Sequence, residues 1–129
     1  MLDSRLLTPH YRLLTPDTRL PLLRGTLELL ILRALRWEPT HGTGVGEWIS
    51  LVTGGAFRID EGTLYPALQR LERRGLIESE WGPSENNRRS RTWQLTSAGR
   101  QQLRAEVAAW ERYVDAVGTV LRHGYPSPF

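Results

Sequence analysis

The chain has 129 residues, of which 40% are apolar and 24% charged, a composition typical of one soluble domain with a modest core. It has no cysteine, no secretory signal and no apolar run near the roughly 20 residues that span a bilayer, so we expect a cytoplasmic protein without disulfides or a membrane segment. The net charge is +3 and every basic residue is arginine, a bias that high genomic GC content also produces but that suits phosphate and guanine recognition.

The first 21 residues read as an N-terminal extension or arm. The motif "RLLTP" occurs at 5–9 and again at 12–16, and prolines interrupt any helix there. The first predicted helix follows at about 22–37. Its leucines and isoleucine leave almost no polar stripe, which predicts burial on several sides. We therefore expect it to contact both its own domain and a second subunit, with Leu27 and Ile31 at the subunit interface.

Two further helices are predicted at about 43–53 and 61–74. The second helix should turn Val45, Trp48, Ile49 and Val52 inward. Asp60 is a plausible N-cap for the third helix, whose Leu64, Leu68 and Leu71 recur at helical spacing. The opposite face of this third helix is polar and rich in arginine, and Pro66 lies within it.

Two strands are predicted at about 76–81 and 91–95, joined by the polar turn "GPSENNRRS". Ile77 and Trp81 should share one apolar strand face, opposite a tip that carries arginines. The result is a β-hairpin with a basic tip.

The last helix, about 97–121, has apolar residues at spacings of 4, 3, 4, 3 and 4. A small domain cannot cover so long a seam, so we expect the same helix of a second subunit to pack on it. The predicted interface on this helix comprises Leu103, Val107, Trp110, Val114, Val117 and Leu121. Residues 122–129 read as a tail.

Three helices followed by a basic-tipped hairpin are the order of a winged helix-turn-helix domain, here residues 22–96, with 97–121 as a dimerisation helix. The fold class is therefore mainly α with a small β-hairpin. In such a domain the third helix enters the major groove of double-stranded DNA and the hairpin contacts the backbone. The predicted DNA-binding residues are Thr63, Tyr65, Pro66, Gln69, Arg70 and Arg73 on the helix, and Asn87, Arg88, Arg89 and Arg91 on the hairpin.

The arginines and Trp110 also have interpretations that involve no binding function. Arginines on a helix and a hairpin tip can simply be solvated, and Trp110 can be a packing residue or the wall of a slot for a flat ligand. Enzymatic patterns are absent: the three histidines are scattered, and no nucleophile elbow or phosphate-binding loop occurs. We expect no enzyme, no metal and no cofactor.

The segments "HG", "EGTLYPALQRLERRGLI" and "RRSRTWQLTSAGR" resemble the PadR family of bacterial transcriptional regulators over about residues 22–121. The resemblance implies a homodimeric repressor on an inverted-repeat operator, in the subfamily with a single C-terminal helix. It also implies that a small hydrophobic or aromatic effector binds at the dimer interface, near Trp110 and Val114. Thr43 replaces a frequent tyrosine, and Val114 replaces an acidic residue of drug-binding relatives. The alternative is a winged-helix protein-interaction module without its own operator.

Overall fold

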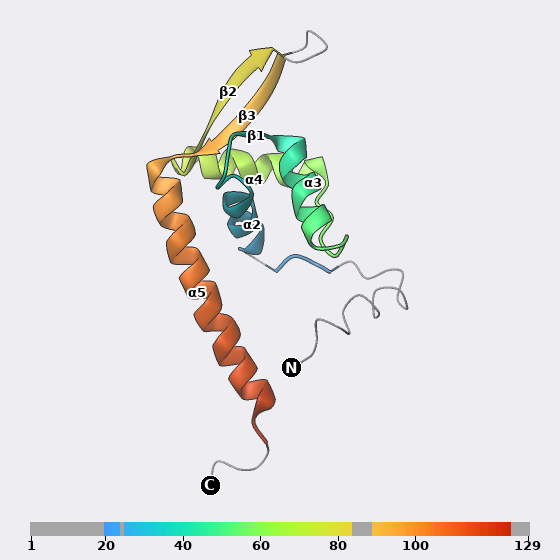
Figure 1. Cartoon of the computed structure of the whole chain (residues 1–129), viewed down its shortest axis with the longest axis vertical. Helices are drawn as coiled ribbons and strands as arrows, with labels where there is room; N and C mark the ends of the chain where they lie inside the picture. Colours follow the sequence, from blue (N-terminus) through green and yellow to red (C-terminus); the bar gives the residue numbers. More distant parts are fainter. Residues whose placement is uncertain (1–19, 24, 84–88, 125–129) are drawn as a thin grey trace.

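The structure is a computed structural model that describes residues 20–23, 25–83 and 89–124. Its elements follow the order α2 (Thr26–Ala34), β1 (Thr40–His41), α3 (Gly42–Val52), α4 (Glu61–Arg73), β2 (Ile77–Pro83), β3 (Arg89–Leu95) and α5 (Ser97–Arg122). The three helices α2, α3 and α4 pack under a small sheet, and α5 leaves the end of β3 and extends past α2 beyond the rest of the domain (Figure 1). This arrangement confirms the predicted fold class.

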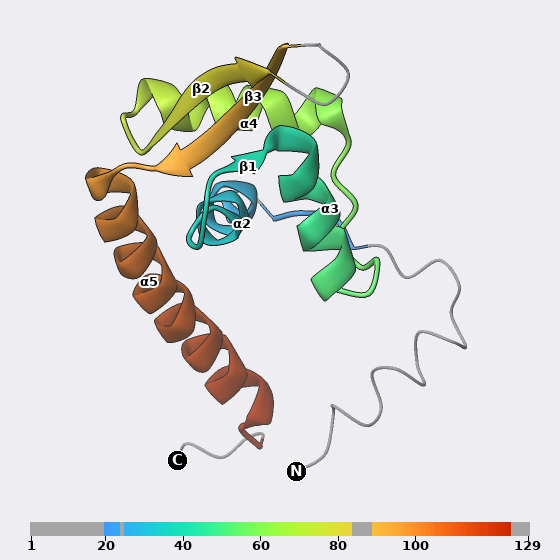
Figure 2. The same cartoon turned by 45° about the horizontal axis from the view of Figure 1, so that its top comes forward.

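The sheet has three antiparallel strands in the order β1-β3-β2. The β2–β3 ribbon pairs Ile77 with Leu95 at its base and Pro83 with Arg89 at its outer end. The strand β1 was not predicted; in it Thr40 pairs with Trp93 and His41 with Thr92. A two-residue strand has no period of its own, and only pairing with distant β3 defines it. β1 ties the start of α3 to the ribbon (Figure 2).

The core lies between the helices and the inner face of the sheet. Its members are apolar and at most 7% exposed: Leu27, Ile31, Leu32, Leu35, Val45, Ile49, Leu64, Ala67, Leu68, Leu71, Leu76, Ile77, Trp93, Leu95 and Leu103. Two predictions of sidedness need correction. Trp48 and Val52 on α3 are exposed rather than inward, because the small core covers only one side of this short helix. Trp81 lies on the strand face of Ile77 but toward the outer end of the ribbon, where it is 53% exposed.

Helix α2 is shorter than predicted. It begins at Thr26, after Gly25 with a φ of 85°, and ends at Ala34 rather than Trp37. A residue with a left-handed backbone conformation cannot be part of a right-handed helix, so α2 cannot extend to residues before Gly25. Glycine adopts this conformation at little cost. Helix α4 matches its prediction closely, because Asp60 accepts a hydrogen bond from the backbone N–H of Thr63 at 2.8 Å.

The start of α5 is locked onto the end of α4. Gly75, with a φ of 76°, ends the α4 segment and turns the chain into β2. Thr96 donates its hydroxyl hydrogen to the carbonyl of Gly75 at 2.7 Å and accepts from the N–H of Gly99 at 3.0 Å. A side chain at Gly99 would collide with the backbone carbonyl of Leu76. The two hydrogen bonds of Thr96 and the close approach at Gly99 explain why a threonine and a glycine occupy these two positions.

We predict opposite effects for two glycine substitutions on α5. Gly99→Ala forces a methyl group onto the Leu76 backbone, and such overpacking costs about 1–3 kcal/mol of unfolding free energy. Gly118→Ala meets only the end of the flexible Arg122 side chain, so its better helix propensity should stabilise by ~0.5–1 kcal/mol. Urea denaturation of both variants measures the difference, and equal effects would contradict the locked junction.

Candidate nucleic-acid interface

Helix α4 has one buried and one exposed face. Leu64, Ala67, Leu68 and Leu71 are buried, whereas the opposite face carries the exposed residues Gly62, Thr63, Pro66, Gln69, Arg70 and Arg73. Pro66 is the sixth residue of α4, and the backbone N–H that it lacks would have bonded Gly62. Gln69 and Arg73 make no hydrogen bond or ion pair with other residues in the described part of the chain, so both are available to an external partner.

Arg70 is partly engaged inside the domain. Its Nε donates to a carboxylate oxygen of Glu28 on α2 at 3.1 Å, and the two side chains are 48% and 22% exposed. An exposed pair of this kind contributes little to stability. Arg70 therefore keeps its place on the outward face of α4 while being oriented by α2.

Tyr65 was predicted to contact DNA, and the structure gives its ring a packing role as well. The side chain is half-buried against the core. A Cβ at Gly42, the first residue of α3, would come within 2.9 Å of the Tyr65 hydroxyl oxygen. Gly42 and Tyr65 therefore pack directly against each other, and this contact sets the spacing between α3 and α4.

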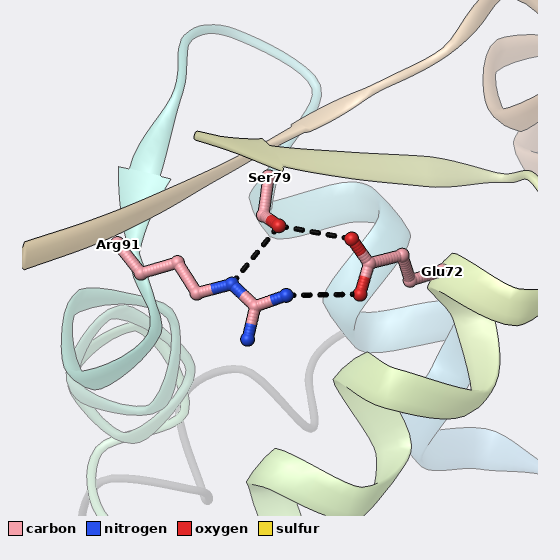
Figure 3. Close-up of polar contacts among 3 residues, drawn as sticks. All are labelled: Glu72, Ser79 and Arg91. Atoms are coloured by element: carbon pink, nitrogen blue, oxygen red, sulfur yellow. Dashed lines mark hydrogen bonds and ion pairs between the residues drawn. The ribbon is translucent and has the colours of Figure 1, made fainter. Parts of the chain in front are cut away.

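Arg91 joins the ribbon to α4 (Figure 3). Its Nη2 donates to Glu72 at 3.1 Å and its Nε to the Ser79 hydroxyl at 2.9 Å, while that hydroxyl donates to Glu72 at 2.9 Å. The guanidinium also lies over the rings of Trp93 and Trp81, at 4.3 and 5.3 Å from their centroids. The predicted DNA contact of Arg91 stays a prediction, and the structure adds that its guanidinium is paired with Glu72 within the chain.

The outer end of the ribbon is described only in part. Arg89 pairs with Pro83 as the first residue of β3, and its side chain is not among those described. The predicted contacts Asn87 and Arg88 lie outside the described residues. The ribbon and α4 nevertheless belong to one unit, because Glu72 and Arg91 connect them directly.

The predicted dimer seam is divided by the fold. Leu27, Ile31 and Leu103 are at most 7% exposed within the chain's own core, so these three predicted interface residues have little surface left for a partner. Val107 is half-buried against that core. Beyond it, Trp110, Val114 and Val117 are 41%, 44% and 39% exposed, and Leu121 is more exposed still. The C-terminal half of α5 therefore presents an uncovered apolar stripe.

Two apolar cavities lie beside Trp110. One, of about 420 Å³, includes Leu30 and Phe57, and the other, of about 470 Å³, includes Tyr113. They share Leu23, Thr26, Leu29 and Trp110. The Trp110 and Tyr113 rings stack at a centroid distance of 6.2 Å. Val114, the other predicted ligand contact, lines neither cavity.

Several functional candidates were missed from the sequence. Glu28, Glu72 and Ser79 orient Arg70 and Arg91, and only their positions in space reveal this. Four arginines line one groove as two pairs, Arg33 with Arg36 and Arg100 with Arg104. The two pairs are far apart in the chain, and no sequence period connects them.

Other kinds of site find no support in the described ranges. No three histidine, aspartate or glutamate side chains gather there as a metal site would require. None of the helices in those ranges is both long and apolar enough to pass through a bilayer. The exposed polar face of α4 remains the principal site of interest.

Comparison with known proteins identifies the family of the chain. Residues 31–105 match the model of the transcriptional regulator PadR-like family. The chain is 34% identical over 88 residues to the transcriptional regulator Rv3488 of Mycobacterium tuberculosis, covering 68% of this chain and 78% of that protein. It is 33% identical over 92 residues to an uncharacterized protein of Lysinibacillus sphaericus, covering 71% of this chain and 84% of the relative.

Solved structures agree with the sequence matches. A PadR family transcriptional regulator from Eggerthella lenta superposes with a TM-score of 0.68 at 30% identity, covering 95% of this chain and all of that one. A transcriptional regulator from Clostridium thermocellum gives a TM-score of 0.69 at 28% identity, covering 74% of this chain and 93% of that one. The winged-helix fold, the exposed face of α4 and the match over 31–105 lead to one conclusion: the chain belongs to the PadR-like family of DNA-binding transcriptional regulators.

Proposed function

We propose that this protein is a repressor that binds an inverted-repeat operator as a homodimer. The observation that carries this proposal is the exposed face of α4, on which Gln69 and Arg73 have no partner among the described residues. A helix of this kind reads base edges in the major groove, and the ribbon beside it holds the backbone. In this division Gln69 reads bases, Arg70 lies beside it on the same exposed face, and Arg73 with the ribbon residues Arg88 and Arg89 contacts phosphates.

The homodimer rests on the uncovered stripe of α5. Trp110, Val114, Val117 and Leu121 follow one face of the helix with the spacing of a two-helix seam. A second copy of α5 covers that stripe and places the two α4 helices on one side of the duplex. A dimer bound across a promoter then blocks polymerase sterically.

The test is to recover the operator directly. Purified protein is mixed with sheared DNA from its source genome, and the retained fragments are sequenced. We expect an enriched inverted repeat whose half-site centres lie about 34 Å, one helical turn, apart. Adding the protein should lower transcription from a promoter that overlaps the repeat. If no fragment is enriched, the interaction module without an operator becomes the better account.

An effector would act through the two cavities beside Trp110. Their volumes fall within the range of small-molecule sites, and their walls are mostly apolar. We predict that planar aromatic compounds quench tryptophan fluorescence saturably and release operator DNA, and that Trp110→Ala abolishes both effects. The control is Trp48→Ala, because Trp48 is exposed on α3 and lines neither cavity. Quenching that survives Trp110→Ala would place the effector elsewhere.

The Glu72–Arg91 ion pair predicts that removing the negative charge of Glu72 weakens operator binding rather than strengthening it. Glu72→Gln removes a negative charge, so pure electrostatics predicts tighter binding to any duplex. If the connection sets the angle between the ribbon and α4, operator binding should instead weaken several-fold. Arg91→Gln and the double variant should then weaken it by a similar amount, since the two residues act as one unit. Additive effects in this double-mutant cycle would show that Arg91 contacts DNA on its own.

A further inference from the structure

A basic groove lies between the C-terminal end of α2 and the first half of α5. Its volume is about 460 Å³, within the usual range for small-molecule sites. Arg33 and Arg36 come from the α2 side, and Arg100 and Arg104 from α5. Leu103, Val107 and Ala108 supply apolar surface between them. Hereafter this is called the arginine groove.

The arginine groove carries an excess of positive charge. Its four guanidinium groups face a single carboxylate, that of Glu111, and none of the five forms an ion pair with a described residue. Arg100 donates to the backbone carbonyl of Arg36 at 3.2 Å, a contact that orients the guanidinium but leaves its charge. Four cationic groups that line one groove favour the binding of an anion there.

The remaining contacts of these arginines also leave their charge uncompensated. The guanidiniums of Arg36 and Arg33 lie 4.6 and 5.9 Å from the ring centroid of Trp37. An aromatic face attracts a cation but supplies no carboxylate. Trp37 is itself largely exposed, so an aromatic surface borders the charged groups.

We propose that the arginine groove binds a small phosphate monoester with an apolar or aromatic body. A phosphate monoester carries about −1.5 to −2 charges at pH 7 and offers three acceptor oxygens, which matches a local charge of four guanidiniums and one carboxylate better than a monocarboxylate does. Guanidinium forks bind phosphate in bidentate geometry. Leu103, Val107 and Ala108 receive the apolar body.

The arginine groove is separate from the sites described above. Among the described residues that line it, none belongs to α4, and Trp110 is not one of them. It joins α2, in the winged-helix domain, to α5, which carries the dimer stripe. The proposal depends on this groove alone, so its failure would leave the DNA-binding function untouched.

The experiment is calorimetric titration of the full chain at low ionic strength with four probes. Phenyl phosphate has both the charge and the apolar body, inorganic phosphate has only the charge, benzyl alcohol only the body, and benzoate one charge with a body. We expect phenyl phosphate to bind most tightly, at one site per chain. Arg33→Gln/Arg104→Gln should weaken it by roughly tenfold or more, as expected for lost charge-assisted hydrogen bonds.

The matched control is Arg112→Gln/Arg122→Gln, which removes the same charge from exposed positions of α5 outside the groove. It should bind phenyl phosphate like the parent chain, and circular dichroism should show both variants folded. Equal binding of all four probes, equal loss in both variants, or no loss in the groove variant would overturn the proposal. So would a reduced salt dependence of non-specific DNA binding, which makes the arginines DNA contacts, or a changed dimerisation constant, which makes a second subunit the occupant.

Discussion

Val114→Glu/Val117→Glu should convert the protein to a monomer and weaken operator binding by roughly 10²–10⁴-fold, the usual gain from linking two sites. Both valines are exposed in the single chain, so the substitutions leave the winged-helix core intact. In a dimer they would place four carboxylates in an apolar seam, where unpaired charges are costly. Sedimentation equilibrium at micromolar concentration gives the mass, and fluorescence anisotropy gives the affinity.

The matched control for this prediction is Ala116→Glu/Thr119→Glu. It adds the same charge to the same stretch of α5, at exposed positions on the face away from the seam. We expect this control to remain dimeric and to bind the operator nearly as well as the parent, apart from a small charge effect. A parent chain that sediments as a monomer, or equal loss in the two variants, would remove α5 from the dimer.

Elements with a strong local period could be predicted from the sequence. The spacing of Leu64, Leu68 and Leu71, with Asp60 as the cap, was sufficient for α4, and α5 was predicted within one residue of its end. The start of α2 could not be predicted, because leucines on both sides of Gly25 favour a helix that continues through it. The strand β1 could not be predicted, since its only support is pairing with residues fifty positions later.

The sequence predicted which face of α4 is exposed, but it could not predict the role of each residue on that face. Helical spacing places Gln69, Arg70 and Arg73 outward, and all three are exposed. What each arginine does depends on residues from other elements. Glu28 approaches Arg70 from α2, and Glu72 with Ser79 holds Arg91. Only the folded chain shows that two predicted DNA contacts have partners inside the protein.

The predicted dimer interface stays a prediction, but the sequence could not show which part of the apolar seam is covered within the chain itself. An apolar seam looks the same whether the same chain or a second one covers it. Here α2 covers the seam at Leu103 and partly at Val107, while Trp110 and Val114 stay exposed. The sequence therefore predicts the stripe, and the packing of α2 decides how much of it is left for a partner.

Replacing Gln69 and Arg73 should separate base reading from phosphate contact. Gln69→Ala should cost about 1–3 kcal/mol of discrimination between operator and scrambled duplex, the usual value of one good base contact. Arg73→Ala should weaken both duplexes and lower the salt slope by about 0.9 per subunit. The reason is their place on the rigid exposed face of α4, where neither has another partner among the described residues.

The most direct measurement is a salt titration of Gln69→Ala/Arg73→Ala on the recovered operator and on a scrambled duplex. The matched control is Gln101→Ala/Arg112→Ala, which removes the same two residue types from exposed positions of α5. We expect the α4 variant to lose both discrimination and salt slope, and the control to bind like the parent. If the α4 variant keeps the parent's discrimination and slope, or if the control loses as much, α4 is not the surface that contacts DNA.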